Sequence, residues 1–300
     1  MPKTSADSNM VRSLITCCPG SGSSVFAHLL NVHPNILSVH EVQIQKPYHK
    51  GRLQRSVSGA LFGKPSFQRD TPNLLDKMWG TDRHPFRNLW LHWAAFRGES
   101  VLVRALLKNT VKDRVDCMID KVPNPKVIGS YARKYPDAKL IYLHRDPFGV
   151  VNSILRKSKG SVVPGVSWGP RLDGVHAEMK HEILAATMYL QCLRWLREAQ
   201  QNAISIHEVF YENFVDDPER VYQGVFDFLG IEVSPETRRD ISKMFSDFPL
   251  RKKRLCGWRT ELTAPAKTEV SRVLEAERKI LPDRYLDSLR TAAGSVAGKG

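Results

Sequence analysis

The sequence predicts a three-layer α/β protein in which a central parallel β-sheet is flanked by helices on both faces. Short apolar, β-prone segments alternate with longer segments of helical character, which is the pattern of βαβ units. A helix-start signal also recurs, in which a capping side chain is followed by proline at the first helical position. This signal occurs at Asn124-Pro125, Asp146-Pro147, Asp217-Pro218 and Ser234-Pro235.

Five segments are predicted to be strands because apolar and β-branched residues dominate them. They span residues 11–18, 36–41, 116–121, 139–145 and 203–211. Helices are expected over residues 25–33, ending before Pro34, and over residues 176–200, which form the longest helix. Ligands of such sheets bind at the carboxyl ends of the strands. We therefore expect a site near the residues that end them: Cys18, Glu41, Lys121 and Arg145.

Length and composition are those of a globular protein. The 300 residues are 42% hydrophobic and 25% charged, which excludes a disordered chain, a collagen and a disulfide-dense miniprotein. We expect a single domain over residues 1–290 that contains an inserted lid or acceptor region at about residues 42–97. The tail over residues 291–300 is expected to be disordered.

The chain is expected to be cytoplasmic and to bind no metal. No stretch approaches the roughly 18 apolar residues of a membrane span, and the first residues lack the apolar core of a secretory signal. The five cysteines are irregularly spaced, which predicts reduced thiols. The formal net charge of +14 favours anionic partners, but it leaves nucleic acid, phosphorylated cofactors, acidic glycans and membrane surfaces open.

The segment after the first predicted strand has the composition of an anion-binding loop. Gly20 and Gly22 let the backbone approach a ligand closely, and unpaired N–H groups at the start of the next helix point toward it. The hydroxyl groups of Ser21, Ser23 and Ser24 add donors. An ordinary Gly/Ser turn is the alternative. No lysine follows Gly22, which argues against a magnesium-dependent ATP or GTP enzyme.

A second anion site is predicted where the fourth strand ends. Arg145 closes that strand, Asp146 caps the next helix and Pro147 opens it. Ser153 lies about 9 Å further along a helix that rises 1.5 Å per residue, so Arg145 and Ser153 can close on one phosphate. The planar guanidinium of arginine suits bidentate binding of phosphate oxygens. The alternative is an N-capped helix beside a salt-bridged arginine.

These motifs, in this order, resemble those of the sulfotransferases that use 3′-phosphoadenosine 5′-phosphosulfate (PAPS). In that family the 5′-phosphosulfate loop reads proline, a basic residue, Ser or Thr, glycine and two further hydroxyl residues. Here the corresponding residues are Pro19, Gly20, Ser21, Gly22, Ser23 and Ser24. The resemblance continues through Arg145 and Ser153, the run YENFVDDPERVYQGVFDFLGI from Tyr211, and RKKRLCGWRTEL from Arg251. It covers about residues 11–262.

The resemblance implies a P-loop NTPase-like fold, PAPS as sulfuryl donor, the bisphosphate PAP as product, and no metal. It implies that the loop at residues 19–24 holds the 5′-phosphosulfate, that Arg145 and Ser153 hold the 3′-phosphate, and that Tyr211 lies near the adenine. Three basic residues would close over the 3′-phosphate: Arg251, Lys252 and Lys253. A solvated or targeting patch is the alternative for these three.

Gly20 departs from the family, which usually has Lys or Arg at this position. The cation is lost, or another basic group such as Lys46 replaces it, or residue 20 requires a positive φ.

The resemblance also implies which residues carry the chemistry. One branch of the family uses a histidine two positions after the third-strand lysine, but here Pro123 follows Lys121 at that distance. The other branch uses a glutamate that ends the second strand after an HPxI run, and HPNILSVHE places Glu41 there. We therefore expect Glu41 to act as general base and Lys121 to stabilise the transferring sulfuryl group. His40 is a weaker base candidate, since alternation sends it to the opposite face. Alternatively, Glu41 pairs with a lid cation and Lys121 with a neighbouring aspartate, Asp120 or Asp146.

The acceptor is expected to offer a hydroxyl group on a small molecule, a lipid or a carbohydrate. Six basic residues and no acidic residue lie between Glu41 and Asp70, which indicates either an acidic acceptor or a solvated basic lid. The alternative functions for the chain are a P-loop kinase of small molecules and a non-enzymatic protein that binds polyanions. This chain lacks the loop lysine that a P-loop kinase needs. A protein that only binds polyanions would leave the ordered motifs unexplained.

Overall fold

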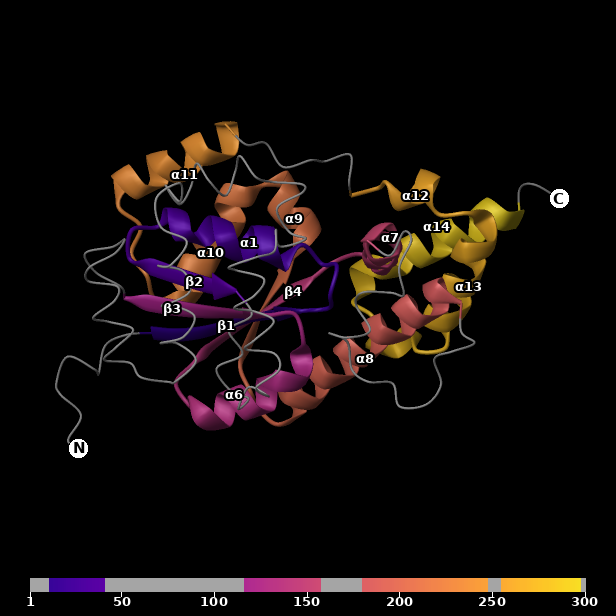
Figure 1. Cartoon of the computed structure of the whole chain (residues 1–300), viewed down its shortest axis with the longest axis horizontal. Coiled ribbons are helices and arrows are strands. Elements are labelled where there is room, and N and C mark those ends of the chain that lie inside the picture. Colours follow the sequence, from indigo (N-terminus) through magenta and orange to yellow (C-terminus); the bar gives the residue numbers. More distant parts are fainter. Residues whose placement is uncertain (1–10, 41–115, 158–179, 248–254, 298–300) are drawn as a thin grey trace, which may run out of the picture.

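The computed structural model describes residues 11–40, 116–157, 180–247 and 255–297. Its centre is a five-stranded sheet in the order β2-β3-β1-β4-β5, and every neighbouring pair of strands is parallel (Figure 1). The strands are β1 (Val11–Cys17), β2 (Ile36–His40), β3 (Cys117–Val122), β4 (Lys139–His144) and β5 (Ile206–Phe210). The predicted parallel sheet and its five strands are confirmed.

The last strand begins later than the sequence predicted. Ala203 has a φ of 58°, and the backbone N–H groups of Asn202 and Ala203 still bond to carbonyls of the preceding helix. Residues 202–203 therefore terminate that helix instead of opening the strand.

Helices connect and cover the strands. The loop after β1 leads into α1 (Ser23–Leu29) and the 3₁₀ turn η2 (Leu30–Val32). The helices on the chain between β3 and β5 are η5 (Pro125–Val127), α6 (Ile128–Lys134), α7 (Pro147–Lys157) and α8 (His181–Gln201). After β5 come α9 (Tyr211–Asp216), α10 (Pro218–Leu229), α11 (Pro235–Asp247), α12 (Trp258–Glu261), α13 (Ala264–Glu275), η8 (Arg278–Ile280), η9 (Asp283–Tyr285) and α14 (Leu286–Ala297).

The four predicted helix starts are confirmed by their capping bonds. In each case a side-chain oxygen accepts a hydrogen bond from a backbone N–H two or three residues later, at 3.1 or 3.2 Å. The acceptors are Asn124, Asp146, Asp217 and Ser234. At Asn124 the helix that follows opens as the 3₁₀ turn η5 before it becomes α6.

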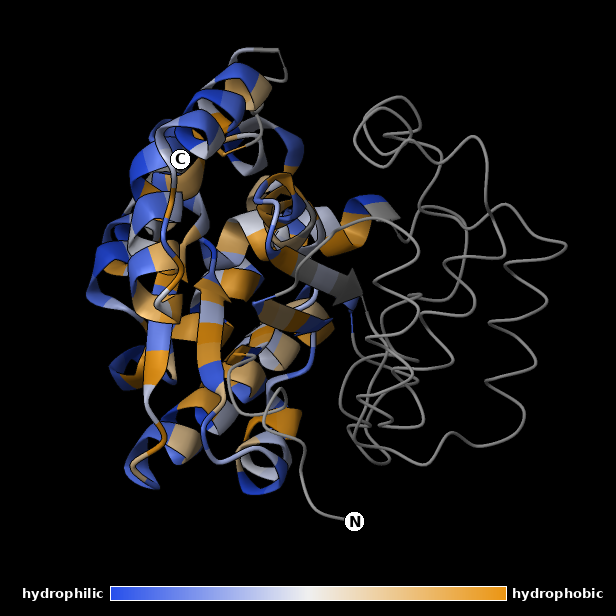
Figure 2. Cartoon of the chain, turned by 90° about the vertical axis from the view of Figure 1, so that its left-hand side faces the viewer, coloured by the Kyte–Doolittle hydropathy of each residue, from blue (hydrophilic) through white to orange (hydrophobic). Residues whose placement is uncertain are grey.

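Alternating strand residues form two cores on opposite faces of the sheet. Leu14 and Tyr142 pack with residues of α7, α8, α13 and α14, whereas Ile15 and Leu143 pack with residues of α1, α10 and α11. In Figure 2 the strands are mainly apolar, while the helices around them carry both hydrophilic and hydrophobic residues. This is the layered arrangement that the alternating elements predicted.

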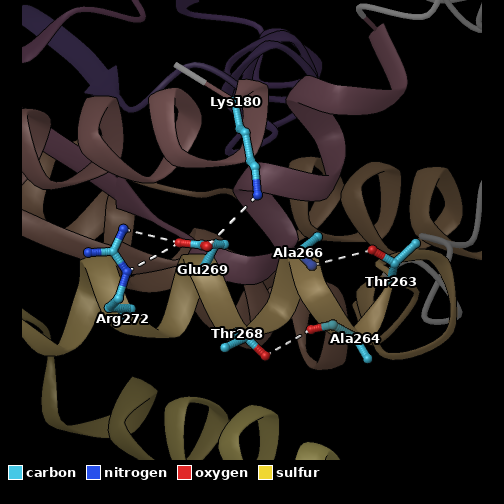
Figure 3. Close-up of polar contacts among 7 residues, drawn as sticks. All are labelled: Lys180, Thr263, Ala264, Ala266, Thr268, Glu269 and Arg272. Carbon is cyan, nitrogen blue, oxygen red and sulfur yellow. Dashed lines mark hydrogen bonds and ion pairs between the residues drawn. The ribbon is translucent and has the colours of Figure 1, made fainter. Parts of the chain in front are cut away.

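The C-terminal helices are fixed to the helix that covers the sheet. Lys180, at the start of α8, lies 3.9 Å from the carboxylate of Glu269 on α13, which also accepts hydrogen bonds from Arg272 (Figure 3). Thr263 caps α13 by accepting from the N–H of Ala266 at 3.3 Å. Among these contacts, the pair Lys180–Glu269 links α8 to α13, and the others lie within α13 or at its start.

The expectation of a disordered tail from residue 291 is corrected over residues 291–297, which belong to α14. The physical reason is burial, because Leu289 and Ala292 of this helix lie in the core cluster. Within the described ranges, no helix is long and apolar enough to cross a bilayer. The expected lid at residues 42–97 lies outside the described residues, so its place in a single domain stays a prediction.

Candidate active site

The predicted site residues that the structure describes gather at the carboxyl edge of the sheet. The loop at residues 18–22 follows β1, and Lys121 is the last residue but one of β3. Arg145 follows β4 and Tyr211 follows β5. Because all strands are parallel, these four places lie at the same edge. Glu41 and the basic residues Arg251, Lys252 and Lys253 lie outside the described residues.

The loop after β1 has a backbone that only glycine adopts readily. Gly20 has a φ of +93° and Gly22 a φ of +86°. A Cβ atom at residue 22 would lie 2.4 Å from Cε2 of Tyr211, so the loop packs directly against that ring. A Cβ at residue 20 would lie 3.5 Å from Cβ of Ser153. The structure therefore brings the glycine loop, Ser153 and Tyr211 together.

Polar groups of the loop are held inside the site. The hydroxyl of Ser21 is buried without a hydrogen-bond partner among the described residues, while Ser23 Oγ accepts from Cys17 Sγ at 3.0 Å. The N–H of Ser21 bonds to the carbonyl of Cys18 at 3.1 Å, and the N–H groups of Val25 and Phe26 both bond to the carbonyl of Gly22, at 3.1 and 3.2 Å. A backbone bent by two glycines beside the buried hydroxyl of Ser21 fits an anionic group such as a phosphate.

Lys121 supplies a buried cation beside this loop. Its side chain is 2% exposed, and its Nζ donates a hydrogen bond to Ser24 Oγ at 3.0 Å. In the sheet register Lys121 pairs with His40, the last residue of β2, and Glu41 follows His40 in the chain. A cation held this deeply is costly to bury unless it is paired or serves a bound anion.

Arg145 joins the two predicted phosphate sites. Its Nη1 donates a hydrogen bond to the carbonyl oxygen of Gly20 at 2.8 Å, and its guanidinium lies 4.8 Å from the ring centroid of Tyr211. The contact with the ring is a cation–π interaction that orients the arginine side chain. The guanidinium thus lies between the glycine loop and the residue expected near adenine.

The α12 helix, which follows the basic segment, docks beside the site. Trp258 is buried and stacks on Phe148 of α7, with ring centroids 4.6 Å apart. Asn152 of α7 donates to the carboxylate of Glu261 at 2.9 Å. Trp258 is therefore a packing residue.

Several polar residues at this edge were missed by sequence reasoning. His144 Nε2 hydrogen-bonds Glu208 Oε2 at 2.5 Å, and Gln200 donates to the other oxygen of Glu208 at 2.7 Å. The hydrogen bond with His144 lowers the pKa of Glu208. Directly after Arg145 in the chain, the backbone N–H of Asp146 donates a hydrogen bond to Glu212 at 2.8 Å. Partners so far apart in the sequence leave no local signal.

The fold is that of an α/β protein with a glycine loop at the carboxyl edge of a parallel sheet. A sequence profile of the sulfotransferase family matches residues 14–235, and the chain belongs to that family. No curated protein matches the chain.

Solved structures show the same fold at low identity. The sulfotransferase domain of the Synechococcus PCC 7002 olefin synthase is 20% identical, with a TM-score of 0.54, and the match covers 94% of this chain and 98% of that one. The sulfotransferase domain of the curacin biosynthetic pathway is 16% identical, with a TM-score of 0.55 and coverage of 90% and 98%. Mouse sulfotransferase SULT7A1, complexed with PAP, is 13% identical, with a TM-score of 0.50 and coverage of 94% and 89%. These likenesses establish the sulfotransferase fold, which is P-loop NTPase-like, as the resemblance implied.

Proposed function

We propose that this sulfotransferase uses PAPS as its donor and transfers the sulfuryl group to a hydroxyl of a small-molecule, lipid or carbohydrate acceptor. The observation that carries the proposal is that the guanidinium of Arg145 contacts both Gly20 and the ring of Tyr211, while Ser153 lies next to Gly20. One end of this group is a glycine loop suited to a phosphate, and the other is an aromatic ring suited to a base. A nucleotide with phosphates at both the 5′ and 3′ positions fits such an arrangement.

The residues that would hold the donor follow from this grouping. The loop at residues 19–24 would hold the 5′-phosphosulfate with its backbone N–H groups and hydroxyls. Arg145 and Ser153 would bind the 3′-phosphate, and Tyr211 would contact the adenine. The basic residues that would close over the 3′-phosphate are Arg251, Lys252 and Lys253. The family resemblance supports this assignment. The PAP bound in the mouse structure supports the same class of ligand.

The chemistry rests on fixed charge and one base. PAPS supplies an activated sulfuryl group when it is bound. Lys121, held at the loop by Ser24, would stabilise negative charge that develops on the transferring oxygens. Glu41 would accept the proton of the attacking hydroxyl, and its place in the chain, directly after the residue paired with Lys121, supports this role. The described ranges contain no group of three or more His, Cys, Asp or Glu that could hold a metal ion.

The acceptor is proposed to be acidic. The six basic residues between Glu41 and Asp70 follow the proposed base directly in the chain and would border the acceptor entrance. A test is to compare transfer of labelled sulfate from PAPS to matched neutral and carboxylated hydroxyl compounds at low and high salt. Faster transfer to the carboxylated compounds that fades at high salt supports this proposal, and equal rates contradict it.

Thermal stabilisation by ligands tests the donor. Because a ligand that binds only the folded protein stabilises it by RT ln(1 + L/Kd), where L is the free ligand concentration, the shift in melting temperature at a given ligand concentration reports affinity. We expect PAP to raise the melting temperature at concentrations where ATP with magnesium does not. A larger shift with ATP and magnesium would instead favour a kinase.

A further inference from the structure

The segment formed by η9 and α14, residues 283–297, contacts the backbone on which the donor site is built. This C-terminal segment lies beyond residue 235, where the match to the family profile ends. Its polar side chains reach the residues that directly follow Arg145 and Tyr211.

Tyr285 makes the first of these contacts. Its hydroxyl donates a hydrogen bond to Glu212 Oε2 at 2.9 Å, and the side chain is 2% exposed. The other oxygen of Glu212 accepts from the backbone N–H of Asp146 at 2.8 Å. One carboxylate therefore links Tyr285 to the residue after Tyr211 and to the residue after Arg145.

Ser288 makes the second contact. Its hydroxyl hydrogen-bonds Asp146 Oδ2, while Asp146 Oδ1 accepts from the N–H of Gly149 at 3.1 Å. A Cβ atom at residue 149 would lie only 3.2 Å from Nε of Arg145, so the arginine side chain lies directly on this backbone. Ser288 is thus connected through Asp146 and Gly149 to the guanidinium.

Arg284 makes the third contact, with residues before and after Tyr211 in the chain. Arg284 donates to Asn213 Oδ1 at 3.0 Å, and its guanidinium lies 4.5 Å from the ring centroid of Phe210. The C-terminal segment therefore touches the residues on both sides of Tyr211.

The two carboxylates need these donors. Asp146 is 7% exposed, and burial, opposed by its hydrogen bond with Ser288 and reinforced by the nearby Glu212, raises its pKa. The buried carboxylate of Asp146 and the half-buried carboxylate of Glu212 repel one another when ionised, and a buried oxygen left without a donor is costly. Removing the hydroxyl of Tyr285 or Ser288 would therefore favour rearrangement of the backbone at residues 145–149 and 211–212.

We propose that Tyr285 and Ser288 are positioning residues for the donor site. Through Glu212 and Asp146 they hold the backbone from which Tyr211 and Arg145 project, so the affinity for the 3′-phosphate depends on a segment outside the residues proposed to bind the donor. This inference rests on the proposed PAPS-binding function.

The test uses the full chain and paired variants, each with a matched control. Tyr285→Phe removes only the hydroxyl, and its control is Tyr131→Phe, because Tyr131 on α6 is equally buried and donates to the carbonyl of Ser13 at 3.0 Å. Ser288→Ala is compared with Thr291→Ala on the same helix, where the hydroxyl bonds only to the carbonyl of Asp287 at 2.8 Å. Melting temperature and PAP affinity by calorimetry are measured for all of them.

We expect both tyrosine variants to melt at lower temperature, but only Tyr285→Phe to bind PAP more weakly. The loss should be about 3- to 10-fold, the range for one intramolecular hydrogen bond. Adenosine 5′-monophosphate, which lacks the 3′-phosphate, separates positioning from general loosening. The ratio of PAP affinity to monophosphate affinity should fall in Tyr285→Phe and Ser288→Ala and stay constant in the two controls.

Two other outcomes would each overturn the inference. If wild-type protein binds PAP and Tyr285→Phe and Ser288→Ala keep the wild-type affinity ratio, the C-terminal segment has a structural role only and the proposed function stands. If wild-type protein binds no PAP, both the proposed function and the inference fail.

Discussion

Arg145 donates a hydrogen bond from Nη1 to the carbonyl oxygen of Gly20 at 2.8 Å, and this bond ties the strand end after β4 to the glycine loop after β1. The two residues are 125 positions apart in the chain. A ligand that bridges the loop and Arg145 meets two sites whose spacing is already fixed, which lowers the ordering cost of binding.

The first prediction concerns the 3′-phosphate. Arg145→Ala should weaken PAP binding about 10- to 150-fold, because a charge-assisted hydrogen bond is worth about 1.5–3 kcal/mol. Ser153→Ala should cost less, since its hydroxyl is neutral. Calorimetric titration with PAP measures both.

Arg194→Ala serves as the control for this titration, because Arg194 pairs with Glu277 at 2.8 Å on the exposed side of α8. PAP affinity in Arg145→Ala equal to that of this control would remove the assignment of the 3′-phosphate site.

The second prediction concerns the base. Glu41→Gln should keep the fold and PAP binding and lower the rate of sulfuryl transfer about 10²- to 10⁴-fold, the usual contribution of a positioned general base. The measurement is transfer of labelled sulfate from PAPS to a panel of phenols, sterols and sugars, beside melting temperature with and without PAP. His40→Ala is the comparison, and a larger loss of rate in that variant would contradict the assignment of Glu41.

The order of elements could be predicted from the sequence because each signal was local. Proline after Asn124, Asp146, Asp217 and Ser234 marks a helix start within a few residues, and the structure has a capping bond at each. The loop and Arg145 were recognisable because an anion site needs glycines and a cation at strand ends.

What the sequence did not show depends on long-range packing. Tyr285 and Glu212 are 73 positions apart, and no local pattern relates them. The tail from residue 291 was expected to be disordered as a chain terminus, but residues 291–297 continue α14, in which Leu289 and Ala292 lie in the core. A choice among the three alternatives for Gly20 also needed the backbone φ of that residue, which the sequence does not give.

The third prediction concerns acid stability at the ends of β4 and β5. The hydrogen bond from His144 lowers the pKa of Glu208 in the folded protein. A group whose pKa is lowered by folding stabilises the protein above its unfolded pKa, and this contribution is lost as the pH falls through the folded pKa. Glu208→Gln should therefore cost about 1–3 kcal/mol at neutral pH, and the difference from wild type should shrink below the usual pKa of a glutamate.

Urea unfolding between neutral pH and pH values of about 3 measures this difference. Glu198→Gln, at an exposed position of α8, is the matched control and should track the wild type throughout. A difference between Glu208→Gln and wild type that grows toward low pH would show that the His144 bond is not the source of the stabilisation.

The fourth prediction concerns Gly20, where the family usually has a basic residue. Its φ of +93° supports the expectation that this position requires a left-handed backbone, and a Cβ would lie 3.3 Å from the carbonyl oxygen of Val150. Gly20→Ala should therefore cost about 1–2 kcal/mol of stability from backbone strain, with a further loss from the close contact. Gly20→Lys carries the same strain, and its new charge approaches Arg145, which already bonds the carbonyl of residue 20. We expect both variants to bind PAP more weakly than wild type.

Gly224→Ala is the matched control for these two variants, because residue 224 lies within α10 and a Cβ there meets nothing within 4 Å. Alanine in a helix is favoured over glycine by about 1 kcal/mol, so this control should be as stable as wild type or more stable, with unchanged PAP affinity. Melting temperatures and PAP titrations of the three variants complete the test. If Gly20→Lys bound PAP more tightly than wild type while Gly20→Ala lost affinity, charge at residue 20 would outweigh strain, and the site would lack a cation that Arg145 does not supply.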